Sequence, residues 1–158
     1  MGEVLDDVRL TTMGLFFEAH AGIKAAFERR LEADVGLPVQ WFEVLLRLAR
    51  TPGHRLRMSE LAAQSSVTPS GLTRVVDRLC DAGLVVRESC PTDRRSWYAT
   101  LTPEGLECIE KAVPVHLDHI EDVVASTLSP AEMDELAAIM RKLRDATNPA
   151  AAGGVGAC

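Results

Sequence analysis

The stretch MSELAAQSSVTPSGLTRVVDRLCDAGLVVRE at residues 58–88 decides the fold. Residues 58–64 have the composition of a short helix, and a polar turn follows them. Thr68 is suited to the N-cap of a helix and Pro69 to its first position, and this pair predicts a second helix over 69–82. Gly83 comes directly after this helix, where a left-handed residue ends many helices. Two helices joined by a tight turn form a helix-turn-helix.

Two β-like runs come next, LVVRES at 84–89 and SWYATLT at 96–102. Both are rich in β-branched or aromatic residues, and they flank the short polar loop 90–95, which contains a proline. This pattern predicts a β-hairpin. A hairpin behind a helix-turn-helix is a wing. The predicted fold class is therefore mainly α with a small β-hairpin wing, a winged helix-turn-helix domain over residues 34–102.

Long helices are predicted on both sides of this domain. Apolar residues recur at three- and four-residue steps along 7–33, and again along 103–127 and 131–146. These helices carry more apolar surface than one winged domain can cover, and uncovered surface of that size marks an interface. We therefore expect the terminal helices to form the dimerisation region of a homodimer, residues 1–33 and 103–147.

Composition and charge narrow the function. The 158 residues carry a formal net charge of −6, yet residues 51–102 hold seven arginines against five acidic residues. A net-basic centre on an acidic body is compatible with binding to DNA phosphates.

The small-residue tail 148–158 is predicted to be disordered. The acidic N-terminus and the absence of a long apolar run predict a cytoplasmic protein without a membrane partner. No phosphate loop or hydrolase motif occurs, so we expect neither an enzyme nor a cofactor.

The second helix of the helix-turn-helix has a face suited to reading DNA. Arginine pairs with guanine edges or with phosphate, and small hydroxyl residues near a helix N-terminus allow close approach. At the loop between the strands, an arginine can enter a narrow minor groove, and Asp93 is close enough to orient it. A solvated helix face and a solvated turn would use the same residue types, so this alternative stays open. The candidate DNA-binding residues are Thr68, Ser70, Thr73, Arg74, Arg78, Asp93, Arg94 and Arg95.

The chain resembles the MarR (multiple antibiotic resistance regulator) family of bacterial transcription regulators. The resemblance is carried by residues 58–88, by the D-x-R pattern of Asp93 and Arg95, and by ATLTPEG at 99–105. It implies an intertwined homodimer with a recognition helix in the major groove, Arg95 in the minor groove and Arg94 at phosphate. A two-fold dimer makes a palindromic double-stranded operator a geometric consequence. The resemblance also implies a repressor that a small phenolic or anionic ligand releases from DNA.

In the family, the effector pocket lies where the dimer helices meet the winged domain. We therefore expect a small aromatic or anionic effector to bind there, although packing in the core is the alternative role for each apolar candidate. The candidate lining residues are Phe16, His20, Trp41, Phe42, Leu45 and His116.

Other roles stay open. Cys80 ends the recognition helix and Cys90 precedes the wing loop, so oxidation at either would give a redox-responsive regulator. A winged-helix protein-interaction module is a further alternative. His116 and His119 share a helix face, but two histidines do not complete a zinc site, and no metal is predicted.

Overall fold

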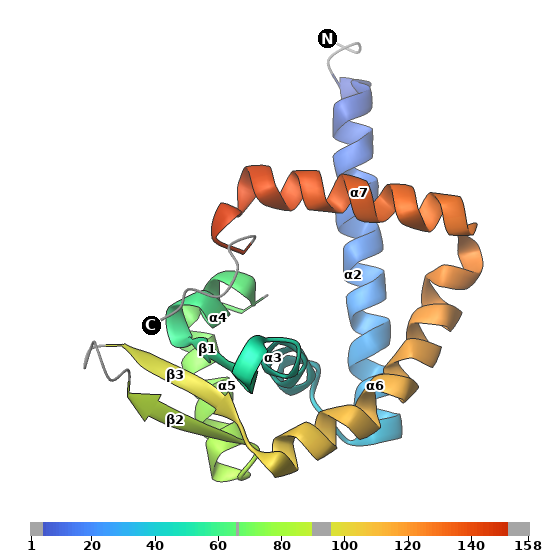
Figure 1. Ribbon diagram of the computed structural model, residues 1–158. Helices are drawn as coiled ribbons and strands as arrows, with labels where there is room; N and C mark the ends of the chain where they lie inside the picture. Colours follow the sequence, from blue (N-terminus) through green and yellow to red (C-terminus); the bar gives the residue numbers. More distant parts are fainter. Residues whose placement is uncertain (1–4, 66, 90–95, 152–158) are drawn as a thin grey trace.

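The structure is a computed structural model that describes residues 5–65, 67–89 and 96–151. It is mostly helical with one small antiparallel sheet, which confirms the predicted fold class (Figure 1). In chain order the elements are α2 (Val8–Val35), α3 (Val39–Ala49), η1 (Pro52–His54), β1 (Arg55–Arg57), α4 (Met58–Gln64), α5 (Pro69–Asp81), β2 (Val85–Ser89), β3 (Trp97–Leu101), α6 (Pro103–Val123), η2 (Ala125–Thr127), α7 (Pro130–Thr147) and η3 (Pro149–Ala151).

The sheet has three strands in the order β1-β3-β2, all antiparallel. The predicted hairpin is its larger part, with Val86 opposite Thr100 and Ser89 opposite Trp97. The third strand, β1, was not predicted, because three residues are too few to show the alternation that identifies a strand. Its central residue, Leu56, is buried and pairs with Ala99 of β3. Strand β1 therefore ties the chain before the helix-turn-helix to the wing.

The core of the winged domain is built around α3. This helix contacts α2, α5, α6 and β3, and its apolar side is almost completely buried. Because α3 reaches all of these elements, it is the common support of the recognition helix and the wing. The buried hydrophobic residues of this cluster are Phe42, Val44, Leu45 and Leu48 from α3, Leu61, Leu72, Val76 and Leu79 from the helix-turn-helix, Leu56, Val85, Ala99 and Leu101 from the sheet, Ile109 and Ala112 from α6, and Leu31 and Leu37 from the end of α2 and the residues after it.

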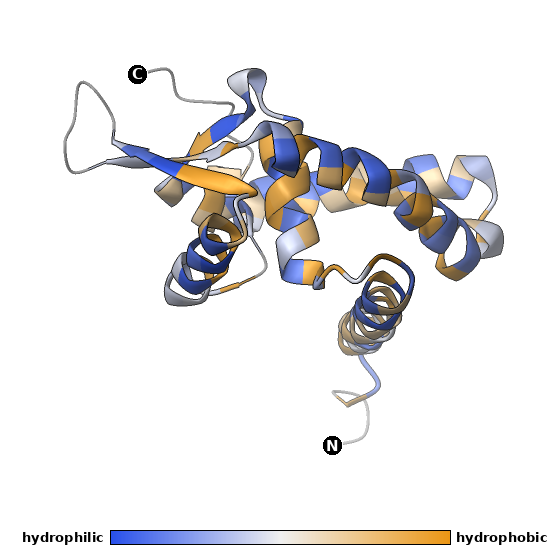
Figure 2. Ribbon diagram, turned by 90° about the horizontal axis from the view of Figure 1, so that it is seen from below, coloured by the Kyte–Doolittle hydropathy of each residue, from blue (hydrophilic) through white to orange (hydrophobic). Residues whose placement is uncertain are grey.

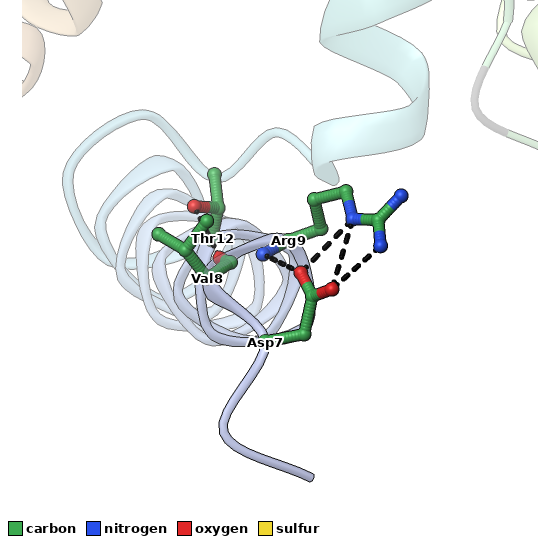
Figure 3. Close-up of polar contacts among 4 residues, drawn as sticks. All are labelled: Asp7, Val8, Arg9 and Thr12. Atoms are coloured by element: carbon green, nitrogen blue, oxygen red, sulfur yellow. Dashed lines mark hydrogen bonds and ion pairs between the residues drawn. The ribbon is translucent and has the colours of Figure 1, made fainter. Parts of the chain in front are cut away.

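Helix α2 packs along only part of its length. It begins at Asp7, whose carboxylate accepts a 2.8 Å hydrogen bond from the backbone N–H of Arg9 and also binds the Arg9 guanidinium (Figure 3). It ends at Gly36, which has a left-handed φ of 68°. Near that end, Asp34 lies 2.8 Å from Nε2 of the buried His119 in α6. Toward the N-terminus, by contrast, the apolar Leu15 is 61% exposed.

The last helix crosses α2 and leads back to the winged domain (Figure 1). After α7, the turn η3 contacts α4, the first helix of the helix-turn-helix. The side-chain amide of Asn148 donates a 2.8 Å hydrogen bond to the carbonyl of Ala63. The small-residue composition of the tail does not predict this contact. Residues 152–158 lie outside the described part of the chain.

Candidate nucleic-acid interface

Helix α5 is the predicted recognition helix, and its local sequence accounts for where it begins and ends. Oγ1 of Thr68 accepts a 3.2 Å hydrogen bond from the N–H of Gly71, as an N-cap does. One face is buried through Leu72, Val76 and Leu79. The chain leaves the helix at Gly83, whose φ of 73° suits glycine.

The opposite face of α5 is exposed to solvent, as the sequence predicted. It presents two arginines, Arg74 and Arg78, with Asp77 between them. Two of the hydroxyls already serve the helix itself: Thr68 caps it, and Thr73 donates to the carbonyl of Pro69 at 3.1 Å. The arginines are thus the best placed groups for base or phosphate contacts. The exposed candidates on this segment are Thr68, Ser70, Thr73, Arg74 and Arg78, and their contact with DNA stays a prediction.

Asp93, Arg94 and Arg95, like Cys90, lie outside the described residues. The strands β2 and β3 that lead to this loop are described, and their register pairs Ser89 with Trp97 at the loop end. The assignment of Arg95 to the minor groove and of Arg94 to phosphate therefore also stays a prediction.

The structure adds cationic residues that the sequence reasoning did not single out. A groove of about 400 Å³ lies between α5, the start of α4 and the sheet, and Arg57, Arg87 and Trp97 contribute to its lining. Nη1 of Arg87 lies 2.9 Å from the carboxylate of Asp77. The excess of arginine in residues 51–102 was the available signal, but it could not show which arginines lie beside the recognition helix.

The candidate effector residues do not form one site. Phe16 and His20 line a cavity of about 390 Å³ between α2, α3 and α7. Trp41 instead lies beside the recognition helix, in a pocket shared with Arg74. Leu45 is fully buried in the hydrophobic core, the alternative role considered for it.

His116 lines a different cavity, of about 480 Å³, which is also lined by residues of α2, α3, α7 and η3 and by Gln64 of α4. Its imidazole makes edge contacts with Phe27 and Phe42, at centroid distances of 4.8 and 4.5 Å. Burial, together with the neighbouring His119, lowers the pKa of His116. A second cavity, of about 650 Å³, lies between α3 and α6 and shares both Phe42 and His116.

Cationic groups also line the His116 cavity. They are Arg47, Arg50 and Arg144. Within the described chain, the buried Nε of Arg47 and the buried Nδ1 of His116 have no hydrogen-bond partner. Buried polar groups are costly to leave unpaired, and Nε–H of Arg47 is a donor, so this cavity is suited to a ligand that accepts a hydrogen bond.

Cys80, which the redox alternative invokes, lies within the described residues and is half-buried. Burial raises the pKa of the Cys80 thiol, which lowers its content of the reactive thiolate at neutral pH. In residues 5–65, 67–89 and 96–151, no group of three or more histidine, cysteine or acidic side chains is arranged to hold a metal. None of the described helices combines the length and the hydropathy that crossing a bilayer requires.

Comparison with known proteins gives a consistent result. The MarR family model matches residues 35–96, which run from the end of α2 to the start of β3. The fold is similar to that of Sco3205, a MarR family transcriptional regulator from Streptomyces coelicolor solved in complex with DNA. That similarity has a TM-score of 0.78 and 35% sequence identity, and it covers 87% of this chain and 86% of the other.

Two further sequences are also similar. A putative transcriptional regulatory protein for the hcr operon of Thauera aromatica is 31% identical over 141 residues, which are 86% of this chain and 83% of that protein. An HTH-type transcriptional repressor of Mycobacterium tuberculosis is 34% identical over 102 residues, 65% of this chain and 72% of the repressor. Given these similarities and the winged helix-turn-helix fold, the chain belongs to the MarR family of DNA-binding transcription regulators, which are not enzymes.

Proposed function

We propose that this protein is a repressor that binds a palindromic double-stranded operator as a homodimer and is released from it by a small aromatic or anionic ligand. The observation that carries the proposal is the exposed face of α5, which presents Arg74 and Arg78 to solvent. Base contacts by such arginines provide sequence readout in the major groove. One of the similar proteins is named as a transcriptional repressor, which supports repression over activation. A regulator of bacterial genes acts in the cytoplasm, where the DNA lies.

Exposed apolar residues on the terminal helices support the dimer. Both Leu15 and Phe17 of α2 are 61% exposed, and Leu117 of α6 is 57% exposed. Figure 2 shows apolar segments along these helices as well as inside the winged domain. A second copy of the chain would cover this surface, which a soluble monomer rarely leaves open. The exposed apolar residues outside the winged domain are Leu5, Val8, Leu10, Met13, Leu15, Phe16, Phe17, Leu117, Leu136, Ile139 and Leu143.

The His116 cavity supports the ligand part of the proposal. Its aromatic residues, Phe27 and Phe42, offer ring contacts, and its arginines attract an anion. It also lies where the terminal helices meet the winged domain, because α2, α7 and Gln64 of α4 all line it. A ligand bound there is placed to change how the recognition helix sits relative to the dimer.

The test is DNase footprinting on the DNA that flanks the protein's own coding sequence, at several salt concentrations. We expect protection of two inverted half-sites about one helical turn apart. Arg95→Ala should weaken the complex most where A·T-rich flanks narrow the minor groove. Benzoate should reduce protection, and benzamide, its uncharged analogue, serves as the control. Protection without sequence preference on every fragment would contradict the operator-binding proposal.

A further inference from the structure

Arg87 extends from wing strand β2 to the exposed face of the recognition helix. Its Nη1 lies 2.9 Å from Oδ1 of Asp77, and its Nη2 donates a 3.2 Å hydrogen bond to the carbonyl oxygen of Thr73. Thr73 and Asp77 are four residues apart, so one guanidinium binds two successive turns of α5. Arg87 uses both terminal nitrogens of its planar guanidinium, and the single ammonium group of a lysine cannot reproduce this pair of contacts.

This contact joins the two predicted reading elements. Residues Val85–Ser89 form the strand that enters the wing loop, and Pro69–Asp81 form the recognition helix. The short turn at Gly83 and direct packing also connect α5 with β2. The contacts of Arg87 thus add a side-chain link between the helix and the wing strand.

The ion pair also changes the charge that α5 presents. Asp77 is the acidic residue between Arg74 and Arg78 on the exposed face, and an unpaired carboxylate there would repel phosphate. Its pairing with Arg87 neutralises that charge while leaving the two arginines of the helix exposed.

We infer that Arg87 is a positioning residue for operator recognition: it fixes the recognition helix to the wing, so that major-groove and wing contacts are made in one register. The inference rests on the proposed operator binding. Arg87 acts through Asp77 and Thr73 and does not itself contact DNA. The side chains of Arg87 and Asp77 are 31% and 53% exposed, and ion pairs this exposed contribute little to folding stability.

The experiment compares affinity for a selected operator with affinity for an unrelated duplex of equal length. The variants are Arg87→Ala, Arg87→Lys, Asp77→Asn and the double variant Asp77→Asn/Arg87→Ala. Arg55→Ala is the matched control, because it removes an exposed strand arginine that stacks on Tyr98 at 5.0 Å. Melting temperatures and the salt dependence of binding are measured for each protein.

Arg87→Ala should lower the operator-to-unrelated affinity ratio at least about fivefold, a typical effect for groups in one network. Asp77→Asn should lower this affinity ratio by a similar factor. The double variant should lower it no more than either single variant does. The affinity ratio of Arg87→Lys should be intermediate, since lysine keeps the positive charge but not the planar guanidinium. The salt slope should stay unchanged, melting temperatures should stay within a few degrees, and Arg55→Ala should leave the ratio unchanged.

Two results would overturn the inference. If Arg87→Ala weakened binding to both duplexes equally and reduced the salt slope by about two per dimer, Arg87 would be a phosphate contact. If it left the ratio at the wild-type value, Arg87 would have no role in recognition, although the operator proposal would stand. Wild-type protein that does not discriminate between the duplexes would contradict the operator proposal itself.

Discussion

Arg74 and Arg78 stand four residues apart on the solvent side of α5, on the same face of one helix. Their neighbours on the buried side, such as Val76 and Leu79, anchor the helix in the core. Contact residues and anchoring residues are therefore separate on this helix. For that reason, an exposed arginine can be removed without unfolding the domain.

We predict that Arg74→Ala and Arg78→Ala each weaken operator binding. A base contact should cost about 1–3 kcal/mol and relax the sequence preference at one position, whereas a phosphate contact should lower affinity for all sequences. Titrations against an operator and its single-base variants distinguish these outcomes. Wild-type affinity in both variants would show that α5 is not the recognition helix.

His116 should make stability depend on pH. Burial and the neighbouring His119 hold the pKa of His116 below its usual 6.5, so the folded protein favours the neutral ring. As pH falls through 6.5, the unfolded chain binds a proton that the folded chain binds less readily. Stability is thus fully present above this pH and decreases below it.

Urea unfolding at pH 7.5 and 5.5 checks this prediction. The midpoint should fall at the lower pH in the wild type and fall less in His116→Gln, which removes the titrating ring. Groups other than His116 are the same in both proteins and cancel in the comparison. An equal fall in both proteins would assign the pH dependence to other groups.

At the residue scale, the sequence predicted which face of α5 is exposed but not what surrounds it. The N-cap Thr68 and the spacing of apolar residues depend on neighbours close in the chain, so both were predictable. The pairing of Arg87 with Asp77 depends on how β2 packs against α5. The separation of His20 from His116 likewise depends on where α2, α6 and α7 cross. A single sequence carries no signal for such contacts.

Among the elements, the start of α6 forms a joint with the end of the recognition helix. The hydroxyl of Thr102 donates a 2.8 Å hydrogen bond to the carbonyl of Gly83 and accepts a 3.0 Å hydrogen bond from the N–H of Gly105. Gly105 lies so close to Leu84 that an added Cβ would be 2.1 Å from the Leu84 carbonyl oxygen. This contact gives a physical reason for the glycine in ATLTPEG at 99–105.

We therefore predict that Gly105→Ala destabilises the protein by about 1–3 kcal/mol, as overpacking of a close contact does. The new methyl group meets backbone, which cannot move aside as a flexible side chain can. Chemical denaturation measures the effect. Gly22→Ala is the control, because nothing lies within 4 Å of its added Cβ. Equal stability of Gly105→Ala and the wild type would contradict the tight joint.

Most elements were predictable because each is defined by a local pattern. The helices 58–64 and 69–82 and the strands 84–89 and 96–102 appear within a residue or so of their expected bounds. The predicted helix at 103–127 ends earlier, at Val123, and continues as the turn η2. Strand β1 and the packing of η3 on α4 were not predicted, since both depend on partners distant in the sequence.

At the scale of the whole molecule, the winged domain and the terminal helices differ in how they bury their apolar residues. The winged domain has its own core around α3, whereas α2 and α7 leave large apolar side chains such as Phe17 and Leu143 exposed. A protein that reads two half-sites must hold two winged domains at a fixed spacing. The exposed apolar surface of the terminal helices is the structural basis we propose for that spacing.

Sedimentation of the protein, alone and with one operator duplex, tests this central claim most directly. The chain has a mass of 17.2 kDa, so a dimer at micromolar concentration should sediment at about 34 kDa. Two chains should bind each duplex, and a charged substitution such as Phe17→Glu in α2 should produce a monomer with weaker operator binding. A stable 17.2 kDa monomer that binds the operator as tightly as any larger species would contradict the account.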